Sequence, residues 1–221
     1  MSRHFLANLS VILLLNVIIK PIYIFGIEVS VQNAVGASSY GLYFAILNSA
    51  YLLQVLNDFG LQIYNNRNVA LSSDALRTSF MPILKVKAGL SILFILLFVI
   101  LTGLLGYWDE WQLILAVGLN LILMSLVLFL RSNISGLGLY RYDSLLSVLD
   151  KGLLILIMGY LLFLSAKDFS ILHFAYGQTV ALVLTALTAV AMLVKKHAFS
   201  SQQGKEVQER AVSILKKAGP F

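Results

Sequence analysis

Six apolar segments, each about the length that crosses a bilayer, dominate this 221-residue sequence. They run from residue 5 to beyond residue 25 and over residues 40–62, 88–107, 111–130, 144–164 and 169–194. A helix that crosses the hydrocarbon core of a bilayer needs about 20 such residues. Only 12% of the residues are charged, about half the share in soluble domains. The sequence therefore predicts an all-α integral membrane protein with six transmembrane helices.

Residue types that carry most enzyme chemistry are scarce or scattered. The chain has no cysteine, which excludes a disulfide scaffold, a thiolate metal site and a cysteine nucleophile. Its three histidines, His4, His173 and His197, lie far apart in the predicted topology, so no metal set can form from them. The net charge of +6 does not indicate nucleic-acid binding, because membrane proteins concentrate basic residues in their cytoplasmic loops. We expect neither an enzyme nor a bound metal or cofactor.

The predicted loops differ sharply in basic residues, which are enriched on the cytoplasmic side of membrane proteins. With a cytoplasmic N-terminus, the outer side carries only Lys167, beside Glu28, Asp109, Glu110 and Asp168. The cytoplasmic side then carries fourteen basic residues: Arg3, Arg67, Arg77, Lys85, Lys87, Arg131, Arg141, Lys151, Lys195, Lys196, Lys205, Arg210, Lys216 and Lys217. This asymmetry predicts that both ends of the chain are cytoplasmic.

The segment after the last apolar run has a different character. Residues 1–196 form the predicted transmembrane unit, and residues 197–221 form a cytoplasmic linker. Val207, Ala211, Ile214 and Leu215 recur at helical spacing among charged residues, as in an amphipathic helix lying on the inner leaflet. The chain then finishes at 219–221 with Gly-Pro-Phe, which is typical of the entry to another element.

Polar residues inside the first apolar segment need a reason to lie at membrane depth, because burying a charge there is costly. Lys20 follows Asn16 by one helical turn, so the two share a face. Pro21 comes next, and it bends the helix and frees a backbone carbonyl. Lys20 either faces a cavity near the middle of the membrane or extends its ammonium group to the outer interface.

The second apolar segment carries a stripe of polar residues spaced by three or four: Asn48, Tyr51, Gln54, Asp58, Gln62 and Asn65. Contacts between helices explain one or two such residues, whereas a cavity filled with water or substrate explains all six. Asp58 is the most costly member of the stripe. It either has a functional role or forms a structural ion pair with Arg67 or Arg131.

Two later segments carry further polar groups. Asn120 and Arg131 lie three turns apart on nearly one face of the fourth segment. At the start of the fifth, Asp150 and Lys151 lie one to two turns inside the helix. Adjacent residues do not face each other on a helix, so each of these two is expected to find its partner on another helix.

Several short motifs resemble those of bacterial polysaccharide flippases, the exporters of O-antigen and lipid-linked oligosaccharides in the MATE-like (MOP) superfamily. The second segment carries YGLY at 40–43, LNDFGL at 56–61 and NRNVA at 66–70. Lys20-Pro21, YDS at 142–144, SVLDK at 147–151 and the final GPF are similar to a subgroup of that family. The resemblance covers essentially the whole chain and is specific to the superfamily rather than to one substrate.

Members of that family have two six-helix lobes around a central cavity, so the resemblance implies that this chain is the N-terminal lobe, a fragment that lacks the second. It also implies the function: alternating-access transfer of undecaprenyl-pyrophosphate-linked oligosaccharide across the bacterial inner membrane, for cell-surface polysaccharide and lipopolysaccharide biosynthesis. Expected partners are the lipid-linked oligosaccharide, membrane lipids, a glycan polymerase and other assembly proteins.

The resemblance also distributes roles among the polar residues. Lys20 and Arg131 are expected to contact the pyrophosphate, and Arg67, Lys85 and Lys87 to recruit it at the cytoplasmic mouth. Asp58 or Asp150 could couple transport to Na⁺ or H⁺. The residues expected to bond the sugars or to line water are Asn16, Asn48, Gln54, Gln62 and Asn120.

Other function classes make different demands on the sequence. A MATE-like cation-coupled exporter favours an acidic, aromatic cavity, and the cationic Lys20 argues against it. An integral-membrane enzyme of glycan assembly needs a large outer loop or a buried His and Asp pair, and neither is visible. A non-catalytic membrane scaffold does not need six polar positions in register.

Overall fold

The computed structural model describes residues 16–72, 74–164 and 169–195, and all regular structure in these ranges is helical. The first predicted segment is therefore described from residue 16 on, and the predicted linker over 197–221 lies outside the described residues. Residues 16–21 are helical. The elements that follow are η1 (Ile22–Glu28), α2 (Val29–Asp58), α3 (Leu61–Leu71), α4 (Asp74–Leu104), η2 (Trp108–Glu110), α5 (Trp111–Gly136), α6 (Tyr140–Leu164) and α7 (Ile171–Lys195).

The first described helix changes type at its proline. Pro21 precedes η1, a π-helix in which the N–H of Val29 still bonds the carbonyl of Ile24, five residues back. Proline cannot donate a backbone hydrogen bond, and π-turns commonly absorb such an interruption inside a longer helix. The wider turn places Tyr23 and Ile27 in the interior.

Two breaks divide the chain between residues 29 and 71. Gly36 has φ 81° and ψ 160°, so α2 consists of two helical stretches that meet at this glycine. Phe59 and Gly60 both have left-handed backbones, with φ 47° and 75°, and they separate α2 from α3. The second apolar segment was predicted as one helix over 40–62, but it is two helices that continue to Leu71. A left-handed residue ends an α-helix because the backbone carbonyls no longer align.

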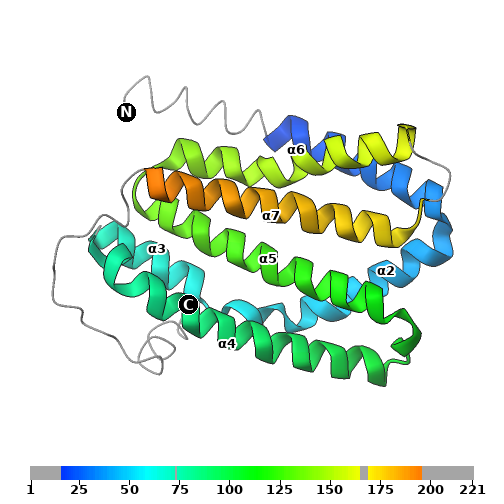
Figure 1. Cartoon of the computed structure of the whole chain (residues 1–221), viewed down its shortest axis with the longest axis horizontal. Coiled ribbons are helices and arrows are strands. Elements are labelled where there is room, and N and C mark those ends of the chain that lie inside the picture. The colour runs from blue at the N-terminus through cyan, green and yellow to red at the C-terminus, as the bar shows by residue number, and fades with distance from the viewer. Residues whose placement is uncertain (1–15, 73, 165–168, 196–221) are drawn as a thin grey trace.

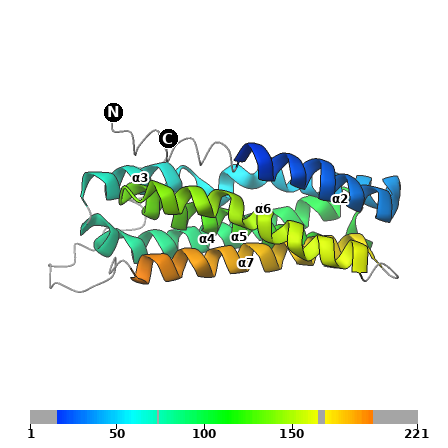
Figure 2. The same ribbon diagram turned by 90° about the horizontal axis from the view of Figure 1, so that it is seen from above.

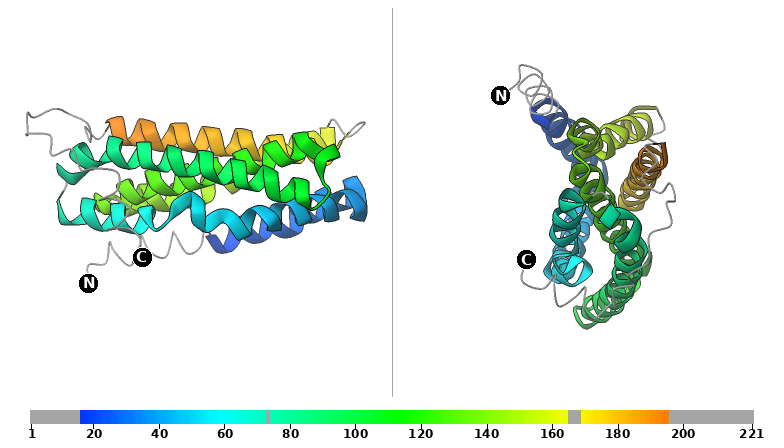
Figure 3. Two further views of the ribbon diagram at one scale, coloured as in Figure 1. Left: turned by 90° about the horizontal axis from the view of Figure 1, so that it is seen from below. Right: turned by 90° about the vertical axis from the view of Figure 1, so that its left-hand side faces the viewer.

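Among the described residues, four helices are long and apolar enough to cross a membrane: Leu76–Leu104, Trp108–Gly136, Tyr140–Phe163 and Ile171–Lys195. Helix α5 lies between α4 on one side and α6 with α7 on the other (Figures 1 and 3). The helices run roughly along one axis (Figure 2). The protein is thus an all-α chain with several membrane-spanning helices. The count of six remains a prediction.

Two apolar clusters hold the bundle together, one toward each end of α5. Phe94, Phe98 and Phe174 belong to the cluster near its start, and Phe80 and Phe129 to the cluster near its end. Of the four membrane-spanning helices, α5 is the most buried: 61% of its most apolar stretch lies inside the protein. Four polar residues of α5, Asn120, Ser125, Ser132 and Asn133, are buried.

Candidate functional site

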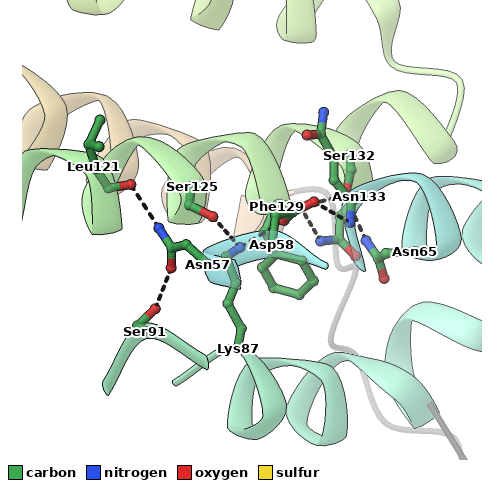
Figure 4. Close-up of polar contacts among 11 residues, drawn as sticks. Asn57, Asp58, Asn65, Lys87, Ser91, Leu121, Ser125, Phe129, Ser132 and Asn133 are labelled. Atoms are coloured by element: carbon green, nitrogen blue, oxygen red, sulfur yellow. Dashed lines mark hydrogen bonds and ion pairs between the residues drawn. The ribbon is translucent and has the colours of Figure 1, made fainter. Parts of the chain in front are cut away.

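An ion pair between a buried lysine and a partly buried aspartate joins α2 to α4 (Figure 4). Lys87 is only 2% exposed, and its Nζ lies 3.0 Å from Oδ1 of Asp58, the last residue of α2. The same Nζ donates to Oγ of Ser125 on α5 at 2.5 Å. A charged group at membrane depth is costly unless it is paired, so Asp58 and Ser125 supply the compensation that Lys87 requires. The pair holds three helices around one point.

This pairing corrects two expectations. The partner of Asp58 is Lys87, where the sequence indicated Arg67 or Arg131. Lys87 was also predicted at the cytoplasmic mouth together with Lys85, but it is buried while Lys85 is exposed. The reason is that α4 begins at Asp74, well before the uninterrupted apolar run, so Lys87 lies more than three turns inside the helix. Two residues apart, the lysines point to opposite sides.

Asn57 is a buried polar residue that the sequence did not single out. Its Nδ2 donates to the carbonyl of Leu121 on α5 at 3.2 Å, and its Oδ1 accepts from Ser91 on α4 at 2.9 Å. The side chain is fully buried, and buried amides need such partners. The only available signal was its place beside Asp58 at a helix end. The predicted stripe, with its spacing of three or four residues, includes Asp58 but not Asn57.

Beyond the break, asparagine side chains of α3 form hydrogen bonds to α5. Nδ2 of Asn65 donates to Oγ of Ser132 at 2.8 Å, and Nδ2 of Asn66 donates to the carbonyl of Ser132 at 3.1 Å. Ser132 and Asn133 each donate to the carbonyl of Phe129 at 2.7 Å. The bonds from Asn65 and Asn66 hold the middle of α3 against the last turns of α5.

The six polar residues of the predicted stripe do not line one cavity. Asn48 is exposed, Asn65 is buried against Ser132, and Oε1 of Gln54 is buried without a hydrogen-bond partner in the described part of the chain. Tyr51 and Gln62 line two different cavities. The break at Phe59–Gly60 separates Gln62 and Asn65 on α3 from the four earlier members on α2, because it ends the regular spacing on which a common face depends.

The cavity that Gln62 lines, here called the arginine cavity, lies where α5 ends and α6 begins and has a volume of ≈ 280 Å³. Nε of Arg131 lies 2.7 Å from Oδ1 of Asp143, and each side chain is 23% exposed. The cavity thus offers guanidinium groups and hydroxyls, with one carboxylate opposing them. Its lining is Gln62, Ile63, Asn66, Arg67, Arg131, Ser132, Ser135 and Asp143.

The second cavity, here called the tyrosine cavity, lies between η1, α2, α5, α6 and α7 and has a volume of ≈ 200 Å³. Its polar lining consists of Tyr23, Glu28, Tyr43, Tyr51, Asn120, Asp150, Lys151 and Gln178. It therefore combines two carboxylates, one ammonium group, three phenols and two amides.

Charged groups in the tyrosine cavity are partnered. Nζ of Lys151 lies 3.5 Å from Oδ2 of Asp150 and 4.8 Å from the centre of the Tyr23 ring. Lys151 thus has the expected partner on another helix, Tyr23 of η1, but it also pairs with Asp150 beside it, which the sequence did not predict. The hydroxyl of Tyr40 donates to Oε1 of Glu28 at 2.8 Å.

Asn120 is fixed by three hydrogen bonds to α7. Its Nδ2 donates to the carbonyl of Ala175 at 2.9 Å and to Oε1 of Gln178 at 3.2 Å, and its Oδ1 accepts from Thr179 at 2.7 Å. Gln178 also exchanges hydrogen bonds with the hydroxyl of Tyr43. The amides of Asn120 and Gln178 are thus held in place at the cavity wall.

The structure brings together some of the predicted site residues and separates others. Arg67, Arg131 and Gln62 line the arginine cavity, and Asn120 and Asp150 line the tyrosine cavity. Nδ2 of Asn16 donates to Oγ of Ser147 on α6 at 3.4 Å. Lys20, one turn later, is exposed. The residues that line neither cavity are Asn16, Lys20, Asn48, Gln54, Asp58, Lys85 and Lys87.

Chemically, the arginine cavity suits an anion with several oxygens, because guanidinium groups bind phosphate oxygens in pairs. The tyrosine cavity suits either sugar hydroxyls, through its amides and phenols, or an organic cation, through its carboxylates and rings. Within residues 16–72, 74–164 and 169–195, no group of three or more His, Asp or Glu side chains is placed to hold a metal ion.

No protein-family model, curated protein or solved structure matches this chain.

Proposed function

We propose that this chain is the N-terminal six-helix lobe of a MATE-like flippase, with residues 197–221 as a linker to a second lobe. In this proposal it moves undecaprenyl-pyrophosphate-linked oligosaccharide from the inner to the outer leaflet of the bacterial inner membrane. Both ends of the chain are then cytoplasmic, as the distribution of basic residues favours. Alternating access exposes the cavities first to one side and then to the other.

The observation that carries the proposal is the arginine cavity. Two arginines line a polar hollow at one end of membrane-spanning helices, the end that the basic residues assign to the cytoplasm. A pyrophosphate that enters the membrane must exchange water for cationic partners, because Coulomb terms are strong in a medium of low dielectric constant. Arg131 and Arg67 supply those cations, with Gln62 and Asn66 beside them.

The polar residues of α5 extend this site toward the middle of the span. Arg131 at the arginine cavity and Asn120 at the tyrosine cavity are eleven residues apart, or about 16 Å along a helix. Ser125, which binds Lys87, lies between them. In the proposed cycle the sugars meet the tyrosines and amides while the pyrophosphate stays on the arginines. Asp150 is then the candidate for ion coupling, because it lines the tyrosine cavity, whereas Asp58 lines neither cavity.

Binding to the purified chain in nanodiscs tests this proposal, with undecaprenyl pyrophosphate and uncharged undecaprenol as probes. We expect the pyrophosphate to bind at least tenfold more tightly than the alcohol. Arg131→Ala should weaken pyrophosphate binding about tenfold, which corresponds to about 1.4 kcal/mol. Arg141→Ala is the matched control, since this exposed arginine lies outside the cavity lining.

Asp143→Asn separates substrate binding from a structural role of the ion pair. If Arg131 binds pyrophosphate, removing the competing carboxylate leaves binding unchanged or tighter. Should Asp143→Asn instead weaken binding as much as Arg131→Ala, the pair serves only to hold α5 to α6, and the proposed substrate site is contradicted.

A second function, export of organic cations, is favoured by the tyrosine cavity. Its two carboxylates exceed its single ammonium group, and three tyrosine rings surround them. Ethidium binding, followed by fluorescence, distinguishes the two functions. If cations are the substrate, Glu28→Gln weakens ethidium binding while Arg131→Ala and the exposed control Glu110→Gln do not. If the chain does not bind ethidium, this second function is excluded.

A further inference from the structure

A wholly apolar groove runs along the side of α5 that is opposite the arginine cavity. It has a volume of ≈ 550 Å³ and lies between α4, α5 and α7, with Phe80, Met81 and Leu84 on one wall and Leu126 and Leu130 at its base. Five residues of α7 form the other wall, and no lining residue is polar. The groove exists because α4 and α7 both pack on α5 and hardly touch each other.

The surroundings of the groove determine what can occupy it. Helices α4, α5 and α7 are all candidate membrane spans, so the groove opens toward hydrocarbon. Water has no polar partner there, and an unfilled hollow would forfeit the dispersion contacts of its walls. An alkyl chain therefore fills it better than water or a vacuum.

The length of the groove matches one leaflet. Its lining on α7 runs from Val183 to Leu193, or about 15 Å along a helix. Half of the roughly 30 Å hydrocarbon core is the same length. The groove begins near the last residues of α7 and ends near mid-membrane, which is the span of a single acyl chain.

The end of the groove at the membrane surface is cationic. Arg77 precedes Phe80, Met81 and Leu84 at helical spacing on α4, so it lies in register above the groove wall and is exposed. Lys195 ends α7 two residues after Leu193 and is also exposed. The start of α4 and the end of α7 lie at the same end of the bundle (Figure 1). A phosphate at the mouth would therefore meet positive charge.

From this juxtaposition we propose that the groove binds an anionic phospholipid of the surrounding leaflet. One acyl chain lies between α4 and α7, and the phosphate lies against Arg77 with Lys195 nearby. The site faces away from the arginine cavity and uses none of its residues. It is therefore independent of the proposed transport function.

Native mass spectrometry of the purified chain tests the site, with dioleoyl phosphatidylglycerol and dioleoyl phosphatidylcholine titrated separately. We expect one phosphatidylglycerol to bind at least tenfold more tightly than phosphatidylcholine. Ala186→Phe fills the groove from α7 and should weaken phosphatidylglycerol binding at least tenfold. Leu184→Phe is the matched control, because this residue is 41% exposed and lies outside the groove lining.

Arg77→Gln is a surface variant that tests the headgroup contact without altering the groove. It should bind the two lipids about equally, because the acyl contacts remain while the charge is lost. The proposal is overturned if Ala186→Phe binds phosphatidylglycerol like the wild type, or if Arg77→Gln keeps the wild-type preference. It is also overturned if undecaprenyl phosphate displaces phosphatidylglycerol at equal concentration, or if the wild type is a dimer that Ala186→Phe dissociates.

Discussion

Two sides of the second half of α5 line hollows of opposite chemistry. Toward α3 and α6 it presents Arg131, Ser132 and Ser135 to a polar cavity. Into the apolar groove between α4 and α7 it presents only Leu123, Leu126 and Leu130. Neighbours at 130 and 131 therefore belong to different environments, since successive residues of a helix diverge by about 100°. One hollow is lined mainly by charged and polar side chains, and the other by apolar side chains alone.

The largest effect should come from the ion pair of Lys87 and Asp58, which lies outside both hollows. Lys87→Met leaves the Asp58 carboxylate, whose side chain is 26% exposed, without its cation, and the loss should lie at the low end for buried pairs, about 3 kcal/mol. Unfolding by sodium dodecyl sulfate in mixed micelles measures the change. The double variant Lys87→Met with Asp58→Asn should regain most of it, because the uncompensated charge is gone. Equal losses in Lys87→Met and in the exposed control Lys85→Met would show that the pair contributes nothing.

The close approach of α3 to α5 should give the next largest effect. A Cβ added at Gly136 would lie 2.8 Å from Cβ of Val69 and 3.0 Å from the carbonyl oxygen of Asn66. Gly136→Ala should therefore cost about 2 kcal/mol through overpacking, measured by the same unfolding assay. Gly89→Ala on α4 meets no atom within 4 Å and should be neutral or slightly stabilising. The contact is not tight if both variants behave alike.

A smaller loss of stability is expected when one side-chain hydrogen bond beside the arginine cavity is removed. Ser132→Ala removes the oxygen that accepts from Asn65 at 2.8 Å, which should cost about 1 kcal/mol. Ser144→Ala is a suitable control, since that exposed hydroxyl bonds only its own helix, at the carbonyl of Tyr140. Unfolding free energies of the two variants that agree within error would contradict a role for this bond in docking α3.

The smallest effect should fall on the apolar side. Leu→Ala in a closed core costs about 2–5 kcal/mol, but at Leu126 an alkyl chain from lipid or detergent can occupy the freed space. Leu126→Ala should therefore cost only about 0.5 kcal/mol, while Leu113→Ala, at a fully buried position, should show the full core penalty. A loss at Leu126 as large as at Leu113 would mean that the groove is part of the closed core.

The sequence predicts the positions of the helices more reliably than the contacts between them. The apolar runs over 111–130 and 144–164 each fall within one helix of the structure, and the run over 169–194 does so from residue 171 on. The start of α4 was missed, because Arg77, Lys85 and Lys87 interrupt the apolar pattern over turns that are nonetheless helical. The break at Phe59–Gly60 was also missed, since a single glycine inside an apolar run rarely ends a helix.

Only part of the candidate site was predicted from the sequence. Arg131, Gln62 and Arg67 were identified and do meet in one cavity. Polarity at membrane depth is visible in any sequence, but a residue that bridges two helices, such as Asn57, looks like one that faces solvent. Which of these it is depends on the rotation of each helix about its own axis.

By itself the sequence determined that this protein is helical and built for a membrane, because the length and polarity of each run decide both locally. Only the tertiary structure decided that Lys87 neutralises Asp58, that the stripe on the second segment divides at Gly60, and that the two sides of α5 differ. These features depend on the order and rotation of packed helices. Both are set by contacts between residues far apart in the chain, which no local pattern contains.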